Sequence, residues 1–367
     1  MGKHYDVVIV GAGAAGVGCG VVLRHLGIEN FTLVDRDNVG ASFARWPAGM
    51  RFITPSFTGN AFGSLDLNAV APATSPAFTL KTEHPTGAEY ARYLRGVAKH
   101  FELPVKRERD VQRIEPLGAG FRIHTSGGPM RARFVIWAAG EFAYPRLNGF
   151  PGAGHCIHNS RVPSWSGFSG EVVVIGGYES GADAACHLAQ AGNRVVVLDR
   201  ASPWTVSDSD PSVALSPYTR DRMRAVNGAV EWTANARVTA VKRSNGRYTV
   251  TAQDGRRWVT ASPPVLATGF AGGLTLIRDL FPWTRQGHAK LTEKDESART
   301  PGLFLAGPQV RHGSAIFCFV YKFRQRFAVV AGEIGSRLGV PLEPLEMYRS
   351  AGMFLDDLSC CGERCPC

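Results

Sequence analysis

The sequence has little of what several classes of protein need. Its 367 residues carry a net charge of +10, but only 20% of them are charged. The densest basic stretch, residues 106–109, includes Glu108, so the continuous basic stripe of a nucleic-acid groove is missing and we expect no nucleic-acid partner. We assign the excess positive charge to phosphate-rich ligands and a scattered surface. The body of the chain also lacks a Cys-x-x-Cys pair, a typical spacing for a redox dithiol.

One uncharged stretch, residues 7–23, is long enough to be considered as a signal peptide or a short membrane span. Five glycines interrupt it and would weaken a free-standing helix, and no stop-transfer segment follows. We therefore expect no membrane span and a cytoplasmic protein. Thiols stay reduced in that compartment, so a cysteine cluster there favours a metal or redox site over a disulfide framework.

What the sequence does have is a globular composition, with 44% apolar residues, and a strand-helix-strand pattern at its start. Residues 5–10 form a β-branched run, residues 14–26 have the pattern of a helix, and residues 31–34 form a second strand. The same order recurs over residues 171–198. The repeat predicts two domains of one type.

The first turn has the glycine spacing of a dinucleotide-binding loop. Gly11 permits the tight turn, Gly13 lets the backbone approach a pyrophosphate, and Gly16 lets helix and strand pack closely. The helix N-terminus offers unpaired N–H groups to the phosphates, and Asp35, at the end of the next strand, would accept hydrogen bonds from a ribose. A glycine-rich helix start without a ligand is the alternative.

The second turn keeps this spacing only in part. Gly176 and Gly181 stand at the first and third glycine positions, but Tyr178 replaces the second. A side chain there should push a pyrophosphate away or widen the loop, so the turn either binds a nicotinamide nucleotide or is a vestige kept for packing. Asp199 favours a 2′-hydroxyl and hence NADH, whereas Arg200 beside it favours a 2′-phosphate and hence NADPH.

Three further motifs complete the pattern: W-A-A-G at residues 137–140, L-A-T-G at 266–269 and G-L-F-L-A-G-P at 302–308. With them the chain resembles flavin-containing monooxygenases and, more distantly, thioredoxin-reductase-like oxidoreductases over about residues 5–340. The resemblance implies an α/β fold with two Rossmann-like dinucleotide-binding domains. Pro308 follows Gly307, where the reductase branch has Asp, and this favours the monooxygenase branch.

The resemblance also implies where the cofactors bind. FAD would lie at Gly11, Gly13, Gly16 and Asp35, with Gly307 on a late flavin-contacting strand. NADPH or NADH would lie at the second loop. We expect the second domain, residues 166–271, to be inserted in the FAD domain, residues 1–165 and 272–345, with residues 346–367 as a Cys-rich tail. The stretch 150–170 is rich in Gly, Pro and polar residues and suits a hinge or linker.

Two segments resemble flavin-site motifs less closely. Residues 40–46 are similar to a loop beside the flavin ring, where Arg45 would stabilise negative charge on reduced flavin and Trp46 would stack; alternatively they are a surface arginine and a core tryptophan. The F-x-G at 150–152 is similar to the monooxygenase fingerprint F-x-G-x-x-x-H. Its histidine position holds Cys156, and His158 comes two residues late, either as a linker residue or as a solvated turn histidine.

The cysteines divide into two groups. Cys19 and Cys186 fall inside expected helices and are typical packing residues, whereas Cys318, near a helix expected to begin around Ser314, could face the flavin. The tail cysteines are too closely spaced for ordinary zinc ligation, and no metal is assigned. They either bind soft ions, form a mobile disulfide that reaches the flavin, or are inert. They are Cys360, Cys361, Cys365 and Cys367.

These features imply an NAD(P)H-dependent FAD oxidoreductase that oxygenates a small nucleophilic substrate through a flavin C4a-hydroperoxide. It is compatible with a homodimer. The alternative enzyme passes flavin electrons to the tail cysteines and on to a disulfide or a thiophilic metal. A third interpretation is a non-catalytic dinucleotide or metal sensor.

Overall fold

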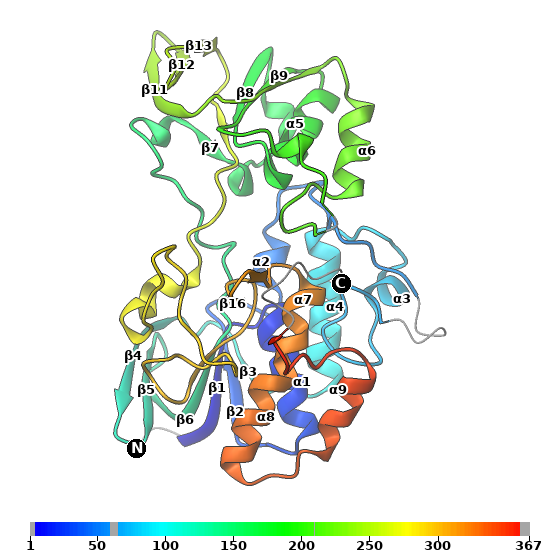
Figure 1. Ribbon diagram of the computed structural model, residues 1–367, viewed down its shortest axis with the longest axis vertical. Helices are drawn as coiled ribbons and strands as arrows, with labels where there is room; N and C mark the ends of the chain where they lie inside the picture. The colour runs from blue at the N-terminus through cyan, green and yellow to red at the C-terminus, as the bar shows by residue number, and fades with distance from the viewer. Residues whose placement is uncertain (1–3, 59–64, 209, 360–367) are drawn as a thin grey trace. The chain divides into compact units, whose positions relative to one another are not determined.

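The computed structural model describes residues 4–58, 65–208 and 210–359, and the chain divides into two compact units (Figure 1). Unit 1 comprises Met1–Arg45, Pro55–Ala143 and Gly272–Cys367. Unit 2 comprises Trp46–Thr54 and Tyr144–Ala271. The expected insertion, residues 166–271, lies within unit 2, which also takes in residues 46–54 and 144–165.

Unit 1 contains a mixed sheet with helices packed beside it (Figure 1). The sheet consists of β1 (His4–Val10), β2 (Phe31–Val34), β3 (Val105–Lys106), β4 (Val111–Leu117), β5 (Gly120–Thr125), β6 (Met130–Trp137) and β15 (Leu303–Leu305). A separate hairpin pairs β16 (Arg311–His312) with β17 (Ala315–Ile316). The helices are α1 (Ala14–His25), α2 (Ala41–Ala44), α3 (Pro76–Leu80), α4 (Gly87–His100), α7 (Val320–Phe323), α8 (Phe327–Leu338) and α9 (Glu346–Ser350).

The parallel strands of this sheet bring their carboxyl ends to one edge. The order is β3-β2-β1-β6, and β15 runs parallel to the carboxyl half of β6. Val10 pairs with both Val34 and Trp137, and Trp137 also pairs with Leu305. The turns that follow these four strands therefore meet, at the place where α/β proteins bind their ligands.

Local sequence signals account for the start and the buried face of helix α4 in unit 1. Helix α4 begins with a capping box, in which the Thr86 hydroxyl accepts from the Glu89 N–H at 3.3 Å and the Glu89 carboxylate accepts from the Thr86 N–H at 2.8 Å. Its Tyr, Leu, Val and Ala face is buried. Helix α1 contacts β1, α4 and α8, so the three helices pack together beside the sheet (Figure 1).

Unit 2 repeats the arrangement in a smaller form. Its parallel sheet has the order β10-β9-β8-β14-β7, and an antiparallel sheet has the order β11-β12-β13. The strands are β7 (Ile157–His158), β8 (Glu171–Ile175), β9 (Arg194–Leu198), β10 (Val230–Thr233), β11 (Val238–Ser244), β12 (Arg247–Ala252), β13 (Arg257–Thr260) and β14 (Val265–Leu266). The helices are α5 (Glu179–Gln190) and α6 (Pro217–Ala225).

Both faces of the second parallel sheet are covered. Val172 and Val174 pack in a cluster with residues of α5, whereas Val173 and Ile175 pack in a cluster with Val241 of the antiparallel sheet. A parallel strand buried on both faces needs a continuous β-branched run rather than an alternating one. The E-V-V-V-I sequence of β8 is such a run.

Three expectations about irregular segments are corrected. The stretch 150–170 is not a plain linker, because β7 lies within it and pairs in parallel with β14. Residues 346–359 are folded onto unit 1, with Tyr348 and Met353 fully buried. A helix does not begin around Ser314; a short hairpin strand occupies residues 315–316, and α7 starts at Val320.

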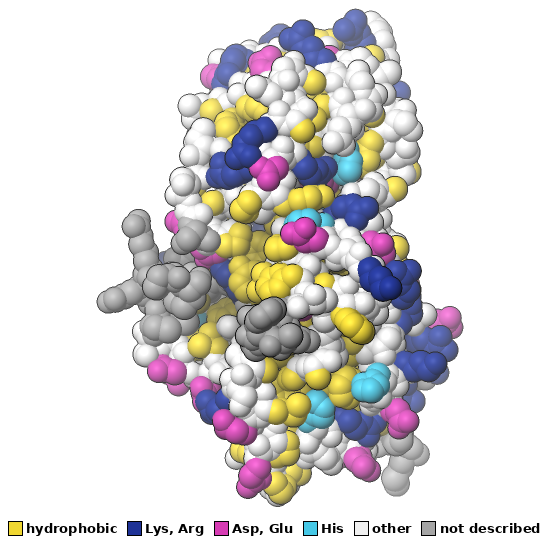
Figure 2. All heavy atoms as spheres, turned by 90° about the vertical axis from the view of Figure 1, so that its right-hand side faces the viewer, with side chains coloured by type: hydrophobic (Ala, Val, Ile, Leu, Met, Phe, Trp, Pro, Cys, Tyr) yellow, Lys and Arg dark blue, Asp and Glu magenta, His cyan; other side chains and the backbone are white. Residues whose placement is uncertain are grey.

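Basic and acidic side chains are interspersed on the face drawn in Figure 2. Among the described residues, the helices are all too short or too polar to cross a bilayer. Within the same residues, His, Cys, Asp and Glu side chains do not gather in groups of three or more that could hold a metal ion.

Candidate dinucleotide sites

The first glycine loop is a tight turn pressed against a neighbouring strand end. Gly11 has a φ of +106°, and a Cβ added there would lie 2.4 Å from the Ala138 carbonyl oxygen. Its N–H donates to the Val34 carbonyl at 2.8 Å. Only glycine combines this left-handed conformation with so close a backbone approach. The W-A-A-G motif after β6 thus forms one wall of the loop.

The loop continues into α1 with its outer side open. A Cβ on Gly16 would lie 1.9 Å from the Gly11 carbonyl oxygen, so helix and strand pack backbone to backbone. A Cβ on Gly13 would meet nothing nearer than the Ser42 Oγ, at 3.9 Å. Gly13 is the N-cap of α1 and makes no side-chain cap. The first N–H groups of α1 therefore remain available for an anion.

Asp35 closes the first site at the end of β2. Its Oδ2 accepts a hydrogen bond from the Ala12 N–H at 2.8 Å, and its Oδ1 accepts one from the Asp37 N–H at 2.8 Å. Burial raises the pKa of Asp35, while these two hydrogen bonds act in the opposite direction. Each carboxylate oxygen keeps a second lone pair, so the group can still accept from ribose hydroxyls.

The second loop has the same geometry. Gly176 has a φ of +104°, and a Cβ there would lie 2.4 Å from the Ala267 carbonyl oxygen of the L-A-T-G motif. A Cβ on Gly181 would lie 1.8 Å from the Gly176 oxygen. The Gly176 N–H donates to the Leu198 carbonyl at 2.9 Å. These three contacts match those of Gly11 and Gly16 in the first loop.

Tyr178 does not widen this loop, and that part of the sequence expectation is wrong. Tyr178 has φ −82° and ψ −167°, and Gly13, at the equivalent position, has φ −82° and ψ −165°. The backbone tolerates a side chain because φ is negative. The Tyr178 hydroxyl lies 2.8 Å from the Pro211 carbonyl oxygen and 3.0 Å from that of Ala214, and it donates to them. The ring thus ties the loop to residues 211–214.

Asp199 ends β9 as Asp35 ends β2. Its Oδ2 accepts from the Gly177 N–H at 2.7 Å, and its Oδ1 accepts from the Ala201 N–H at 2.8 Å. Arg200 beside it is exposed. The two carboxylates are therefore oriented by matching pairs of backbone N–H groups.

The segment 202–220, which sequence reasoning missed, packs beside the second loop. A Cβ on Gly177 would lie 2.5 Å from the Trp204 ring. Glu179, the first residue of α5, accepts from the Ser216 N–H and the Thr219 hydroxyl, both at 2.5 Å. Nothing in the local sequence around Trp204 signals this contact, because it joins residues on separate turns.

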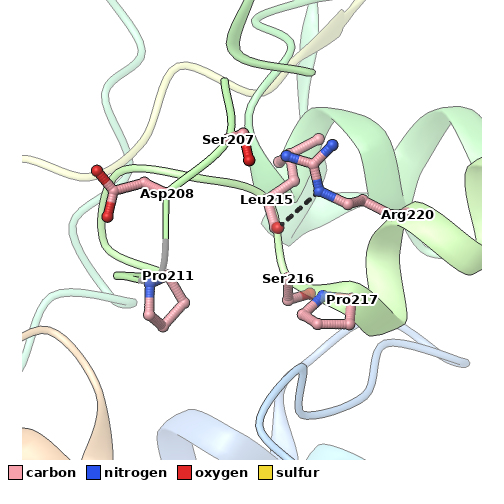
Figure 3. Close-up of a pocket in the computed structure, with 7 residues that line it drawn as sticks. All are labelled: Ser207, Asp208, Pro211, Leu215, Ser216, Pro217 and Arg220. Carbon is pink, nitrogen blue, oxygen red and sulfur yellow. Dashed lines mark hydrogen bonds between the residues drawn. The ribbon is translucent and has the colours of Figure 1, made fainter. Parts of the chain in front are cut away.

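A pocket of about 240 Å³ opens within this segment (Figure 3). The Arg220 Nε donates to the Leu215 carbonyl at 3.1 Å on one side of the pocket, and Pro211 and Pro217 lie below this hydrogen bond in the view of Figure 3. The lining residues are Ser207, Asp208, Pro211, Leu215, Ser216, Pro217 and Arg220.

These paired loops agree with the comparison with known proteins. The sequence pattern of the family described as "Pyridine nucleotide-disulphide oxidoreductase" matches residues 8–307, most of the chain. The chain belongs to this family. The resemblance expected from its motifs is thereby confirmed, as is the α/β fold with two Rossmann-like domains.

Individual members of the family carry different names. The chain is 28% identical over 239 residues to flavin-containing monooxygenase FMO GS-OX2 of Arabidopsis thaliana, covering 56% of this chain and 51% of that protein. It is 27% identical over 202 residues to bacilliredoxin reductase Bdr of Bacillus subtilis, covering 54% and 58%. The chain thus spans about half the length of the curated relatives it matches.

A solved structure shares the fold over nearly the whole chain. The bacillithiol disulfide reductase Bdr from Staphylococcus aureus superposes with a TM-score of 0.74 and 21% sequence identity. The superposition covers 91% of this chain and 99% of that one. At this identity the likeness concerns the fold alone.

The residues of this family member fit two dinucleotides. Each loop has a first glycine at positive φ, a helix N-terminus and an acidic residue at the next strand end. In unit 1, Gly307 has a φ of +106°, and a Cβ there would lie 3.2 Å from the Ala15 Cβ in the first turn of α1. The late strand β15 therefore ends against the first loop, where a side chain would fill the remaining space.

The other predicted flavin-site residues are spread more widely. Arg45 forms an ion pair with Asp37, two residues beyond Asp35. Trp46 belongs to unit 2 and packs against Phe52 with ring centroids 5.0 Å apart. Cys318 is half-buried. Burial lowers the pKa of Arg311, and Cys318 lies close enough to Arg311 to act in the opposite direction. The tail cysteines lie outside the described residues.

His158 is not a solvated turn histidine. It is buried on β7, where its Nε2 lies 3.1 Å from the Gly269 carbonyl oxygen and its Nδ1 lies 2.8 Å from the Ser160 hydroxyl. Its ring also makes an edge contact with Phe270. Burial lowers the pKa of His158, the hydrogen bond to the Gly269 carbonyl acts in the opposite direction, and the charge of Arg161 lowers the pKa further. The imidazole links the L-A-T-G turn to β7.

Proposed function

We propose that this protein is an NAD(P)H-dependent FAD oxidoreductase, with FAD at the first loop and the nicotinamide nucleotide at the second. The observation that carries the proposal is the duplication of one loop geometry, each copy with an acidic residue held by two backbone N–H groups. A protein that binds one dinucleotide needs one such loop. Two of them on one chain suit the transfer of electrons from one dinucleotide to another.

The chain's own groups then have defined tasks. FAD, when bound, supplies the ring that accepts a hydride. The open face of Gly13 and the first N–H groups of α1 bind the pyrophosphate, and Asp35 binds the ribose. Because Gly307 has no side chain, β15 can end close to α1 without filling the space beside the loop.

Oxygenation of a small nucleophilic substrate is the reaction we favour. Three of the four described cysteines, Cys19, Cys156 and Cys186, are poor relays, because burial raises the pKa of each thiol, to about 11 for Cys186 and about 12 for Cys156. Cys19 is fully buried, and its pKa is raised further. The thiolate is the reactive form, so these thiols do not suit disulfide exchange. Pro308 after Gly307 supports the same branch of the family.

The experiment begins with the purified full chain. We expect a yellow protein whose flavin is bleached by NADH or NADPH without oxygen. With oxygen and a thioether or amine, nucleotide consumption should match formation of a product that carries ¹⁸O from ¹⁸O₂. Absence of bound flavin contradicts the whole proposal. Bleaching followed only by hydrogen peroxide, with every substrate tried, contradicts the oxygenase part.

Thiol reduction is the second candidate, because of Cys318. The Arg311 side chain donates to the Val310 carbonyl at 2.7 Å and to that of Pro308 at 2.6 Å, which links the surroundings of Cys318 to the Gly307 turn. A guanidinium nearby favours a thiolate. In this case Cys318→Ser should abolish NAD(P)H-dependent reduction of a disulfide, whereas Cys186→Ser, at a buried packing position, should leave it intact. Equal rates for both variants would exclude Cys318.

Other aspects stay predictions from the sequence. They are the cytoplasmic location, a possible homodimer and the absence of a nucleic-acid partner.

A further inference from the structure

We propose, resting on the proposed nicotinamide-nucleotide site at the second loop, that this site selects NADH over NADPH and that Asp199 determines the choice. The two nucleotides differ only by a phosphate on the 2′-oxygen of the adenosine ribose. Discrimination must therefore come from the side chains beside that oxygen. In this fold they lie at the end of the second strand of the strand-helix-strand repeat, which here is β9.

The chain carries its own reference for a ribose without a 2′-phosphate. FAD has a free 2′-hydroxyl on its adenosine ribose, and Asp35 stands at the corresponding position of the first loop. The hydrogen bonds from Asp35 to Ala12 and Asp37 are both 2.8 Å, and those from Asp199 to Gly177 and Ala201 are 2.7 and 2.8 Å. Asp199 is thus oriented as a ribose-hydroxyl acceptor.

The same geometry opposes a 2′-phosphate. Such a group carries up to two negative charges near pH 7 and would lie next to the Asp199 carboxylate. The carboxylate cannot turn away without breaking both of its backbone hydrogen bonds. The negative charges of the 2′-phosphate and the Asp199 carboxylate would repel each other strongly, because the site is partly buried.

Arg220, in segment 202–220, already donates hydrogen bonds to backbone carbonyls. The Arg220 Nε donates to the Leu215 carbonyl at 3.1 Å, one terminal nitrogen donates to the Trp204 carbonyl at 3.3 Å, and the other donates to the Val206 carbonyl. All three nitrogens thus bind backbone oxygens. Arg200 is exposed and follows Asp199 directly. If a 2′-phosphate were to bind, Arg200 would have to compensate its repulsion by the Asp199 carboxylate.

Trp204 narrows the space around the ribose position. The added Cβ on Gly177 that meets the Trp204 ring at 2.5 Å would also lie 3.3 Å from the Asp199 Cβ. The indole, the loop backbone and the carboxylate are therefore neighbours. The Trp204 ring packs against the Trp232 ring, with ring centroids 5.2 Å apart. An uncharged wall of this kind offers a phosphate no compensating charge.

The test uses two probes without a nicotinamide ring, ADP-ribose and 2′-phospho-ADP-ribose, titrated calorimetrically into the flavin-loaded full chain. We expect ADP-ribose to bind at least about tenfold more tightly, a difference of about 1.4 kcal/mol. Anaerobic flavin reduction by NADH and NADPH should show the same preference. Asp199→Ser should reduce or reverse both preferences, whereas Asp254→Ser, on the exposed turn between β12 and β13, should leave them unchanged.

Each failure has its own signature. Equal or tighter binding of 2′-phospho-ADP-ribose overturns the selection, although flavin reduction by either nucleotide would still support the proposed function. An unchanged preference in a folded Asp199→Ser variant overturns the role of Asp199. If the Asp199→Ser variant fails to fold, the same measurements are made on Asp199→Asn, whose side-chain amide keeps one oxygen acceptor. If neither probe binds and neither nucleotide reduces the flavin, the proposed function fails.

Discussion

Single glycines at the first loop allow close backbone contacts that the methyl group of an alanine would prevent. In Gly16→Ala the new Cβ would lie 1.9 Å from the Gly11 carbonyl oxygen, and both groups are backbone-anchored. We expect loss of flavin and a stability loss of roughly 1–3 kcal/mol, as for other overpacked sites. The measurements are the ratio of flavin to protein absorbance and the free energy of unfolding in urea.

Gly96→Ala provides the matched control for this substitution. Gly96 lies in α4, and a Cβ there meets nothing within 4 Å. That variant should keep its flavin and gain up to about 1 kcal/mol from helix propensity. A Gly16→Ala protein with a full complement of flavin would show that the loop relaxes more easily than its geometry indicates.

His158 makes unit 2 sensitive to acid. Burial lowers its pKa below the ordinary value of 6.5, so the unfolded chain binds its proton at a higher pH than the folded chain does. Stability from this residue is therefore complete above about pH 6.5 and decreases as the pH falls below that value. His158→Gln removes the titrating group.

The comparison of these two proteins isolates the effect. We expect the melting temperature of the wild type, relative to that of His158→Gln, to fall between pH 7 and pH 5. His25, whose pKa is also lowered by burial, is present in both proteins and cancels in the difference. A difference that stays constant with pH would mean that His158 does not titrate in this range.

At the scale of elements, the strand-turn-helix units were predictable because their signals are local. The predicted strand 31–34 coincides with β2, and the strand-helix-strand order predicted over residues 171–198 is that of β8, α5 and β9. Unbroken Val and Ile runs and a capping box act over a few residues. The loop glycines were predictable for the same reason.

Elements held by distant partners were not predictable. Strand β7 contains only two residues and exists because β14, over 100 residues later, pairs with it. Trp204 reaches the second loop through contacts with Gly177, which no spacing in the sequence reveals. Residues 46–54 join unit 2 although the chain on both sides of them belongs to unit 1.

The link from the second loop to residues 211–214 can be tested through Tyr178. Tyr178→Phe removes the hydroxyl that donates to the Pro211 and Ala214 carbonyls, at a cost of about 1 kcal/mol. We expect faster limited proteolysis within residues 207–217. Tyr248→Phe is the control, because that ring is contacted through its face by Arg243 on an antiparallel hairpin. Identical cleavage of both variants would remove the anchoring role of Tyr178.

At the scale of the whole molecule, the chain returns from unit 2 to complete unit 1, and its last described residues are fixed there. Arg326 is buried and donates to the Asp295 carboxylate at 2.9 Å and to the Leu355 carbonyl. The Leu355 N–H donates to the Gln325 carbonyl at 3.0 Å. The described part of unit 1 therefore ends in a folded segment.

The contribution of residues 360–367 to function can be tested by truncation. We expect a chain that ends at Ser359 to keep its flavin, its melting temperature and its rate of NAD(P)H oxidation, because the anchoring contacts involve residues before that point. A chain that ends at Gly352 should be less stable, because it also loses the buried Met353 and the Leu355 contacts. If the chain ending at Ser359 stays folded and flavin-loaded but loses turnover, electrons leave the flavin through the tail cysteines, and thiol chemistry replaces oxygenation as the function.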